Sequence, residues 1–284
     1  MALPIHATFG QRLAALGLPI LTAVVLFFLV APILLVVPLS FTAGELLMYP
    51  IPGWSLRWYR DFLTNEMWTT ALRNSLVLGI ITTIVATLLG TLAALGLHGL
   101  TSSRLRALLL GLLVTPLVIP LVIVAVAIFY YYARIGLAGS FTGLVIAHTV
   151  LALPFVVVTV AATLQGFDRN LTRAAASLGA SPATAFLRVT LPLIGSGVVS
   201  GALFAFVTSF DELLVVLFIA SPLQRTLPRQ IYSGVTESIS PTVTAAAVVL
   251  VVVTLGLMGI VEWLRRRAER LRGIQEGANA HETP

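Results

Sequence analysis

Six long stretches without a charged residue constrain what this chain can fold into. They cover residues 13–44, 74–103, 107–133, 135–167, 189–210 and 238–261. A helix needs about 20 apolar residues to cross the roughly 30 Å hydrocarbon core of a bilayer, and each stretch is long enough. The sequence therefore predicts an all-α membrane protein with six transmembrane helices, at about 16–41, 74–98, 106–132, 138–164, 193–220 and 243–263.

The composition agrees with a lipid bilayer as the surroundings of these helices. Only 10% of the residues are charged, compared with about 25% in a soluble domain. Apolar residues occupy every face of the predicted helices rather than one stripe. The net charge of +6 is carried by arginines scattered between apolar runs, which suits a membrane surface better than a nucleic acid. We expect the bilayer as a partner and no nucleic acid.

Two missing residue types exclude some kinds of chemistry. The chain has no lysine, so it lacks the phosphate-binding loop of nucleotide hydrolases, whose lysine contacts the phosphates. It also has no cysteine, which excludes disulfides, thiolate metal sites and a cysteine nucleophile. Its four histidines lie far apart in the sequence, and we expect no metal site.

The distribution of arginines predicts the orientation of the chain. If the N-terminus is cytoplasmic, most arginines fall on the cytoplasmic side, including the cluster at 265–272. The predicted organisation is a cytoplasmic N-terminus at 1–15, a transmembrane domain at 16–264 and a cytoplasmic tail at 265–284. Both termini are then cytoplasmic.

The cytoplasmic loop at about 165–192 is predicted to form a helix–turn–helix. Asp168 or Asn170 is suited to cap a short helix that ends at Gly179, because glycine adopts a left-handed conformation without steric cost. Ser181 followed by Pro182 is typical of the start of a second helix, predicted to run to about Thr190.

This loop resembles the EAA loop of binding-protein-dependent ABC importer permeases. Ala174 and Ala175 match the two alanines, Gly179 the glycine, Val189 the isoleucine, and Leu191-Pro192 the end of the motif. Arg173 stands where the family usually has glutamate. The segments FDE at 210–212, LPRQIYSG at 227–234 and ESISPT at 237–242 resemble the polyamine (spermidine/putrescine) branch. The resemblance implies that the loop couples the chain to an ATPase through Arg173, Ala174, Ala175, Ala176, Gly179, Ala180, Ser181 and Pro182.

The resemblance also implies partners and a location. The chain is expected to be a permease subunit of the bacterial inner membrane and not an enzyme, forming half of a translocation pathway with a second permease. An ABC ATPase dimer would bind ATP and magnesium, so this chain needs no cofactor. An extracytoplasmic solute-binding protein would deliver the substrate.

Two adjacent carboxylates, Asp211 and Glu212, interrupt the fifth predicted transmembrane helix. A charge inside a membrane is costly, so it normally faces a polar cavity or a partner. Carboxylates attract ammonium groups, and we predict that these two residues belong to a pathway for a small cation. Neighbours on a helix point about 100° apart, so we expect one to line the cavity while the other pairs with an arginine or faces the partner permease. Ser209, Tyr232 and Glu237 are weaker candidates for the same pathway. The alternative is that both carboxylates simply lie at the membrane interface.

Other sequence features leave one rival function open. A stand-alone secondary transporter or channel is the alternative to a permease subunit, although no internal repeat is evident. An intramembrane enzyme ranks last, because no H-E-x-x-H or G-x-S-x-G motif is present.

Three further residues are predicted to have structural roles. His148 is predicted to be a buried hydrogen-bonding residue, and Gly197 with Gly201 forms a G-x-x-x-G pattern typical of helix packing.

Overall fold

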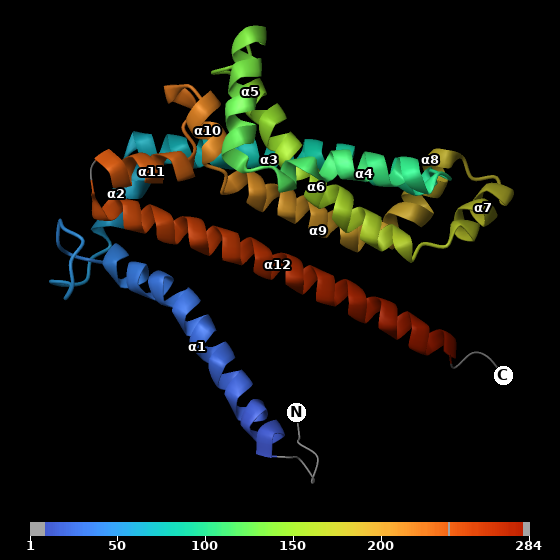
Figure 1. Ribbon diagram of the computed structural model, residues 1–284, viewed down its shortest axis with the longest axis horizontal. Coiled ribbons are helices and arrows are strands. Elements are labelled where there is room, and N and C mark those ends of the chain that lie inside the picture. The colour runs from blue at the N-terminus through green and yellow to red at the C-terminus, as the bar shows by residue number, and fades with distance from the viewer. Residues whose placement is uncertain (1–8, 238, 281–284) are drawn as a thin grey trace. The chain divides into compact units, whose positions relative to one another are not determined.

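The computed structural model describes residues 9–237 and 239–280. Within these ranges it is helical, with no strand beyond an isolated bridge between Thr42 and Trp54. The α-helices are α1 (Phe9–Ser40), α2 (Arg57–Thr64), α3 (Glu66–Gly99), α4 (Ser103–Val118), α5 (Leu121–Ile135), α6 (Phe141–Gln165), α7 (Arg169–Ser177), α8 (Pro182–Ala185), α9 (Leu191–Phe210), α10 (Leu214–Ile219), α11 (Leu227–Glu237) and α12 (Pro241–Ala280) (Figure 1).

The all-α membrane class is confirmed. Among the described residues, five helical segments are long and apolar enough to span a bilayer: Gly17–Ser40, Glu66–Gly99, Phe141–Gln165, Pro182–Phe210 and Pro241–Ile260. The pair α4 and α5 supplies a sixth span if it is counted as one. The predicted cytoplasmic segments 1–15 and 265–284 extend outside the described residues, and so do the side chains of the arginine cluster at 265–272.

Two of the predicted helices are interrupted, and the prediction of one continuous helix is wrong in both places. The helix expected at 106–132 is divided into α4 and α5, which are bent by 100° at Ile119 and Pro120. Proline has no N–H to donate, and it holds the residue before it in an extended conformation. The helix expected at 193–220 ends at Phe210, and a separate short helix, α10, begins at Leu214.

The first of two compact units contains residues 1–64 and 234–249. In this unit, side-chain hydrogen bonds hold α2 in place. The Trp58 indole donates to the Thr42 carbonyl at 2.8 Å, and the hydroxyls of Ser40 and Tyr59 are 2.7 Å apart. The Thr242 hydroxyl donates to Asp61 at 2.7 Å, which joins α2 to the start of α12.

The second unit contains residues 65–233 and 250–284, and its centre is the packing of α3, α6 and α9. Glycines allow these helices to approach closely. A Cβ built on Gly201 would lie 2.6 Å from the Thr159 hydroxyl, and one on Gly197 would lie 2.5 Å from the Thr163 hydroxyl. Small residues play this role widely in membrane helix pairs. The prediction that the G-x-x-x-G pattern serves helix packing is confirmed.

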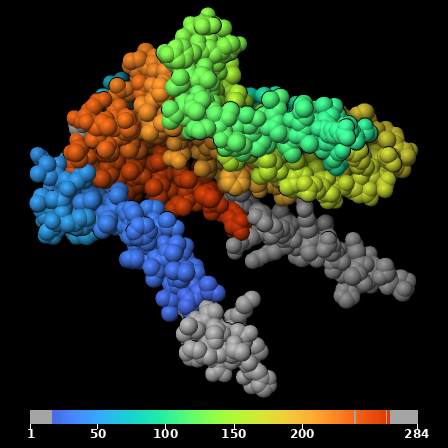
Figure 2. Space-filling view, in the orientation of Figure 1, coloured from blue at the N-terminus to red at the C-terminus, as the bar shows by residue number. Residues whose placement is uncertain are grey.

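The two ends of this helix group differ. The short helices α7 and α8 lie at one end, where α6 stops and α9 begins (Figure 1). At the other end α5 packs on α10, and α5 projects away from α4 (Figure 2). The loop with the EAA-like motif and the interruption at Asp211 are therefore separated by the length of α9.

Candidate functional site

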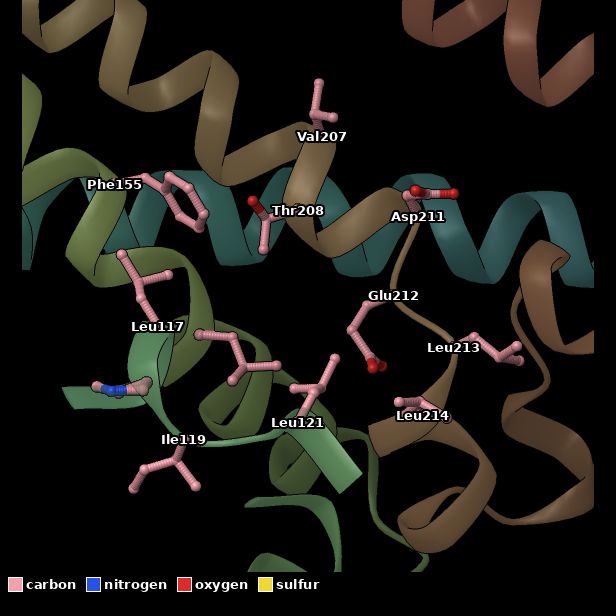
Figure 3. A pocket seen from close by; sticks show the side chains of 12 residues that line it. Leu117, Ile119, Leu121, Phe155, Val207, Thr208, Asp211, Glu212, Leu213 and Leu214 are labelled. Atoms are coloured by element: carbon pink, nitrogen blue, oxygen red, sulfur yellow. The ribbon is translucent and has the colours of Figure 1, made fainter. Parts of the chain in front are cut away.

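A cavity of about 610 Å³ lies where two helix interruptions meet. The bend between α4 and α5 forms one wall, α6 forms a second, and the end of α9 with the start of α10 forms a third (Figure 3). Its surface is mostly apolar, with Leu117, Leu121 and Phe155 among the lining residues. Apart from Thr208, the polar lining side chains are Asp211 and Glu212.

Asp211 is the exposed carboxylate of this cavity. It follows the last residue of α9, and its backbone N–H still donates to the Val207 carbonyl at 3.0 Å. Its side chain makes no hydrogen bond or ion pair with a residue in the described part of the chain. The carboxylate is therefore available to a ligand in the cavity.

Glu212 lines the same cavity but is only 6% exposed. Its two carboxylate oxygens accept the backbone N–H groups of Val215 at 2.8 Å and Val216 at 3.2 Å. These N–H groups belong to the first turn of α10, where a helix has no backbone acceptors for them. Figure 3 shows the Glu212 side chain directed away from that of Asp211.

Ser209 lies beside the cavity without lining it. It is 3% exposed, and its hydroxyl is 2.9 Å from Nδ1 of His148. The prediction that His148 is a buried hydrogen-bonding residue is confirmed, since the side chain is completely buried. His148 and Ser209 are 61 positions apart in the sequence, so no local pattern connects them.

Tyr232 and Glu237 lie elsewhere. Both are exposed residues of α11, and neither is among the residues that line the cavity. The structure therefore brings Asp211 and Glu212 together at one cavity, with Ser209 behind it, and the lining of this cavity includes neither of the two α11 residues.

The loop 165–192 has the predicted helix–turn–helix form. The Asp168 carboxylate accepts the Asn170 N–H at 2.9 Å and caps α7. Gly179 has φ of +84° and donates to Ala176, while Ala180 donates to Ala175, each at 3.0 Å. These two bonds define a Schellman motif, the common glycine-containing end of a helix.

The second helix of the loop starts at Pro182 with Ser181 as its cap, as predicted. Instead of ending near Thr190, it passes through a π-helical turn at Phe186–Thr190 directly into α9. A π-turn inserts one residue into a helix without breaking it. The loop is therefore continuous in helical structure with α9, which ends at Phe210 directly before Asp211.

Most side chains of the loop are exposed. Arg173, Ala174, Ala176, Gly179, Ser181 and Pro182 are exposed, and Ala175 and Ala180 are partly buried. Leu178, an apolar residue at the end of α7, is 89% exposed.

One anchor of this loop was missed in the sequence. Arg169 donates from Nε to Nε2 of His98 at 3.1 Å and from Nη2 to the His98 carbonyl. The sequence separation of these two residues left no local signal. This contact holds the start of α7 against the end of α3.

Comparison with known proteins identifies the family. Residues 86–270 match the family model described as "Binding-protein-dependent transport system inner membrane component". The chain is similar to the Putrescine transport system permease protein PotI of Escherichia coli (strain K12), with 33% identity over 87% of this chain and 91% of that protein. It is also similar to the Spermidine/putrescine transport system permease protein PotC of the same strain, with 32% identity over 72% of this chain and 76% of that protein.

A solved structure shares the fold. A chain in the crystal structure of a bacterial ABC transporter involved in the import of the acidic polysaccharide alginate matches with a TM-score of 0.71. The match covers 90% of this chain and 96% of that chain at 18% identity. Taken together with the family match, this shows that the chain belongs to the inner-membrane components of binding-protein-dependent transport systems, the permease subunits of ABC importers.

Proposed function

We propose that this chain forms half of the translocation pathway for a small organic cation such as putrescine or spermidine. The observation that carries the proposal is Asp211, an exposed carboxylate that lines a mostly apolar cavity and has no hydrogen-bond or ion-pair partner among the described residues. An alkyl diamine has the complementary chemistry, because its ammonium group suits the carboxylate and its methylene chain suits the apolar walls. The names of PotI and PotC support the same class of substrate.

The helix ends around the cavity favour a positive charge as well. The C-terminal end of a helix carries a partial negative charge, and α9 ends next to Asp211. The opposite charge at the start of α10 is neutralised by Glu212. The end of α4 and the start of α5 meet at the bend and offset each other. The balance around Asp211 is therefore negative.

The cavity has a suitable size for such a solute. About 610 Å³ lies within the range of roughly 300–1,000 Å³ that is usual for small-molecule sites. The cavity is open, as a transport site must be for part of its cycle. A second permease of the same fold would face it and complete the pathway.

We further propose that the loop 165–192 couples transport to a separate ATPase dimer. Its EAA-like motif, the exposed Leu178 and the continuous helix from Pro182 into α9 support this role. Movement of the loop would pass along α9 to the Asp211 end. Docking on the ATPase places the loop on the cytoplasmic side of the membrane, and both termini are on this side as well. An extracytoplasmic binding protein delivers the solute to the opposite end of the pathway.

Uptake into liposomes tests the proposal. The chain is reconstituted with its second permease, the ATPase dimer and the binding protein, with ATP enclosed with the ATPase. We expect ATP-dependent movement of labelled putrescine or spermidine and none of a neutral disaccharide. Disaccharide transport without diamine transport contradicts the cationic substrate, and diamine uptake without ATP contradicts the coupling to an ATPase.

A further inference from the structure

Three polar side chains behind the cavity form a buried cluster, the His148–Ser209–Glu212 cluster. His148 comes from the middle of α6, Ser209 from the last turn of α9, and Glu212 from the connection to α10. Their exposed fractions are 0%, 3% and 6%. Nδ1 of His148 is 2.9 Å from the Ser209 hydroxyl, and Nε2 is 3.7 Å from a Glu212 oxygen.

The surroundings of the His148 ring favour one of its two neutral tautomers. A neutral imidazole carries its proton on one nitrogen and accepts on the other. With the proton on Nε2, the ring accepts the Ser209 O–H at Nδ1 and directs its N–H toward the Glu212 carboxylate. The distance of 3.7 Å is beyond hydrogen-bond range, so this contact is electrostatic, and Nε2 has no hydrogen-bond partner among the described residues. The opposite tautomer would face a nitrogen lone pair toward the carboxylate, which is repulsive. The first arrangement joins α6 to both sides of the interruption after α9.

Both carboxylate oxygens of Glu212 are hydrogen-bonded to groups of the protein itself. Both accept N–H groups of the first turn of α10, and one of them faces the histidine. Figure 3 shows this side chain pointing toward the start of α10, near Leu214, whereas the Asp211 side chain points elsewhere. The adjacent carboxylates thus have different surroundings: Glu212 is hydrogen-bonded to protein groups, and Asp211 is exposed at the edge of the cavity.

The sequence that directly follows the interruption contains no residue that would break a helix. The run from Leu213 to Ala220 is apolar and contains neither glycine nor proline. Nothing in this run itself requires α9 to stop at Phe210. The contacts of Glu212 start α10 separately, and they are made to α10 and to α6 rather than to α9.

We propose that the His148–Ser209–Glu212 cluster maintains the interruption between α9 and α10 and thereby places the Asp211 carboxylate in the cavity. Glu212 is then a positioning residue and not a ligand of the transported cation. This inference rests on the proposed function for the role of Asp211, but the geometry of the interruption is measurable without transport.

The test uses the absence of cysteine from this chain. Leu213→Cys introduces a single reporter thiol at the interruption, on a residue that lines the cavity. The assembled complex is treated with a neutral maleimide, and mass spectrometry of this chain measures the rate at which the thiol reacts. The KM for putrescine uptake is measured in the same backgrounds. The variants are Asp211→Asn, Glu212→Gln, Glu212→Ala, His148→Phe and the milder Ser209→Ala.

The expected results separate the two carboxylates. Asp211→Asn raises the KM about tenfold and leaves the labelling rate unchanged. Glu212→Ala, His148→Phe and, to a smaller degree, Ser209→Ala change the labelling rate and raise the KM together. Glu212→Gln keeps an acceptor oxygen for α10, so it changes both readouts less than Glu212→Ala does.

Two results would overturn the inference. If Glu212→Gln raises the KM as much as Asp211→Asn at an unchanged labelling rate, Glu212 binds the cation directly. If Glu212→Ala and His148→Phe leave the labelling rate unchanged, the cluster does not maintain the interruption. Failure of the proposed function is distinguishable, because Asp211→Asn would then have no effect on the KM while the labelling changes persist.

Discussion

Replacing Gly179 by alanine isolates the backbone of the loop 165–192. A Cβ at this position would meet no atom within 4 Å, so the substitution creates no clash. The cost comes from φ of +84°, because an L-residue in the left-handed region is disfavoured by about 1–2 kcal/mol. This corresponds to a roughly 5–30-fold lower ratio of closed to open turn, and so to a larger population of the open turn.

Amide hydrogen exchange measures this population. The Ala180 N–H is protected by its bond to the Ala175 carbonyl at 3.0 Å, and its exchange should accelerate about 5–30-fold in Gly179→Ala. Gly166→Ala is the matched control. Gly166 also follows a helix and has no atom within 4 Å of a built Cβ, but its φ is −91°.

The control decides how the result is read. Gly166→Ala should leave the exchange of Ala180 unchanged, since alanine adopts that backbone conformation freely. Equal exchange in Gly179→Ala and Gly166→Ala would refute the Schellman motif as the element that closes the turn. If the loop docks on the ATPase, Gly179→Ala also lowers substrate-stimulated ATP hydrolysis in the complex.

Two further substitutions test the packing of α6 on α9 and the connection between α10 and α11. Gly201→Ala places a Cβ 2.6 Å from the Thr159 hydroxyl and should destabilise the protein by about 1–3 kcal/mol, lowering its thermal midpoint in detergent. Gly195→Ala, with no atom within 4 Å, should not, and equal midpoints would contradict the close approach of α6 and α9. Asn74→Ala removes two side-chain bonds, to the carbonyls of Leu223 at 3.0 Å and Arg225 at 2.9 Å. Trypsin should then cut after Arg225 faster, whereas an unchanged rate would show that other contacts hold this loop.

Local rules predicted the loop 165–192 well, because its signals lie within a few residues. Asp168 caps α7, Gly179 ends it in a left-handed conformation, and Ser181 with Pro182 starts the next helix. Each depends on the chemistry of one residue and its immediate backbone. The continuity of that helix into α9 was missed, since Pro192 fits the first turn after a π-turn without stopping the helix.

The interruptions around the cavity were harder to predict. The length of a charge-free stretch shows that a segment crosses the membrane, but not that it is one helix. Pro120 gave a visible signal for the bend between α4 and α5, although not for its size of 100°. The interruption at Asp211 had no such signal. It depends on Glu212 meeting His148 of α6, a contact between residues far apart in the sequence.

The candidate site was predicted only in part, because it too depends on contacts between residues far apart in the sequence. Asp211 and Glu212 stood out as charges in an apolar segment, and both line the cavity. Their different surroundings arise from the tertiary packing. Tyr232 and Glu237 were candidates because aromatic and acidic side chains attract ammonium groups, but they lie on α11 and are not among the residues that line the cavity.

The most direct measurement is the KM for ATP-dependent putrescine uptake by the reconstituted complex carrying Asp211→Asn, with Glu45→Gln as the matched control. Glu45 is an exposed carboxylate that does not line the cavity. Loss of a charged contact predicts a KM raised about tenfold for Asp211→Asn and unchanged for Glu45→Gln. An unchanged KM in Asp211→Asn, with normal assembly, would contradict the claim that this carboxylate receives the cation.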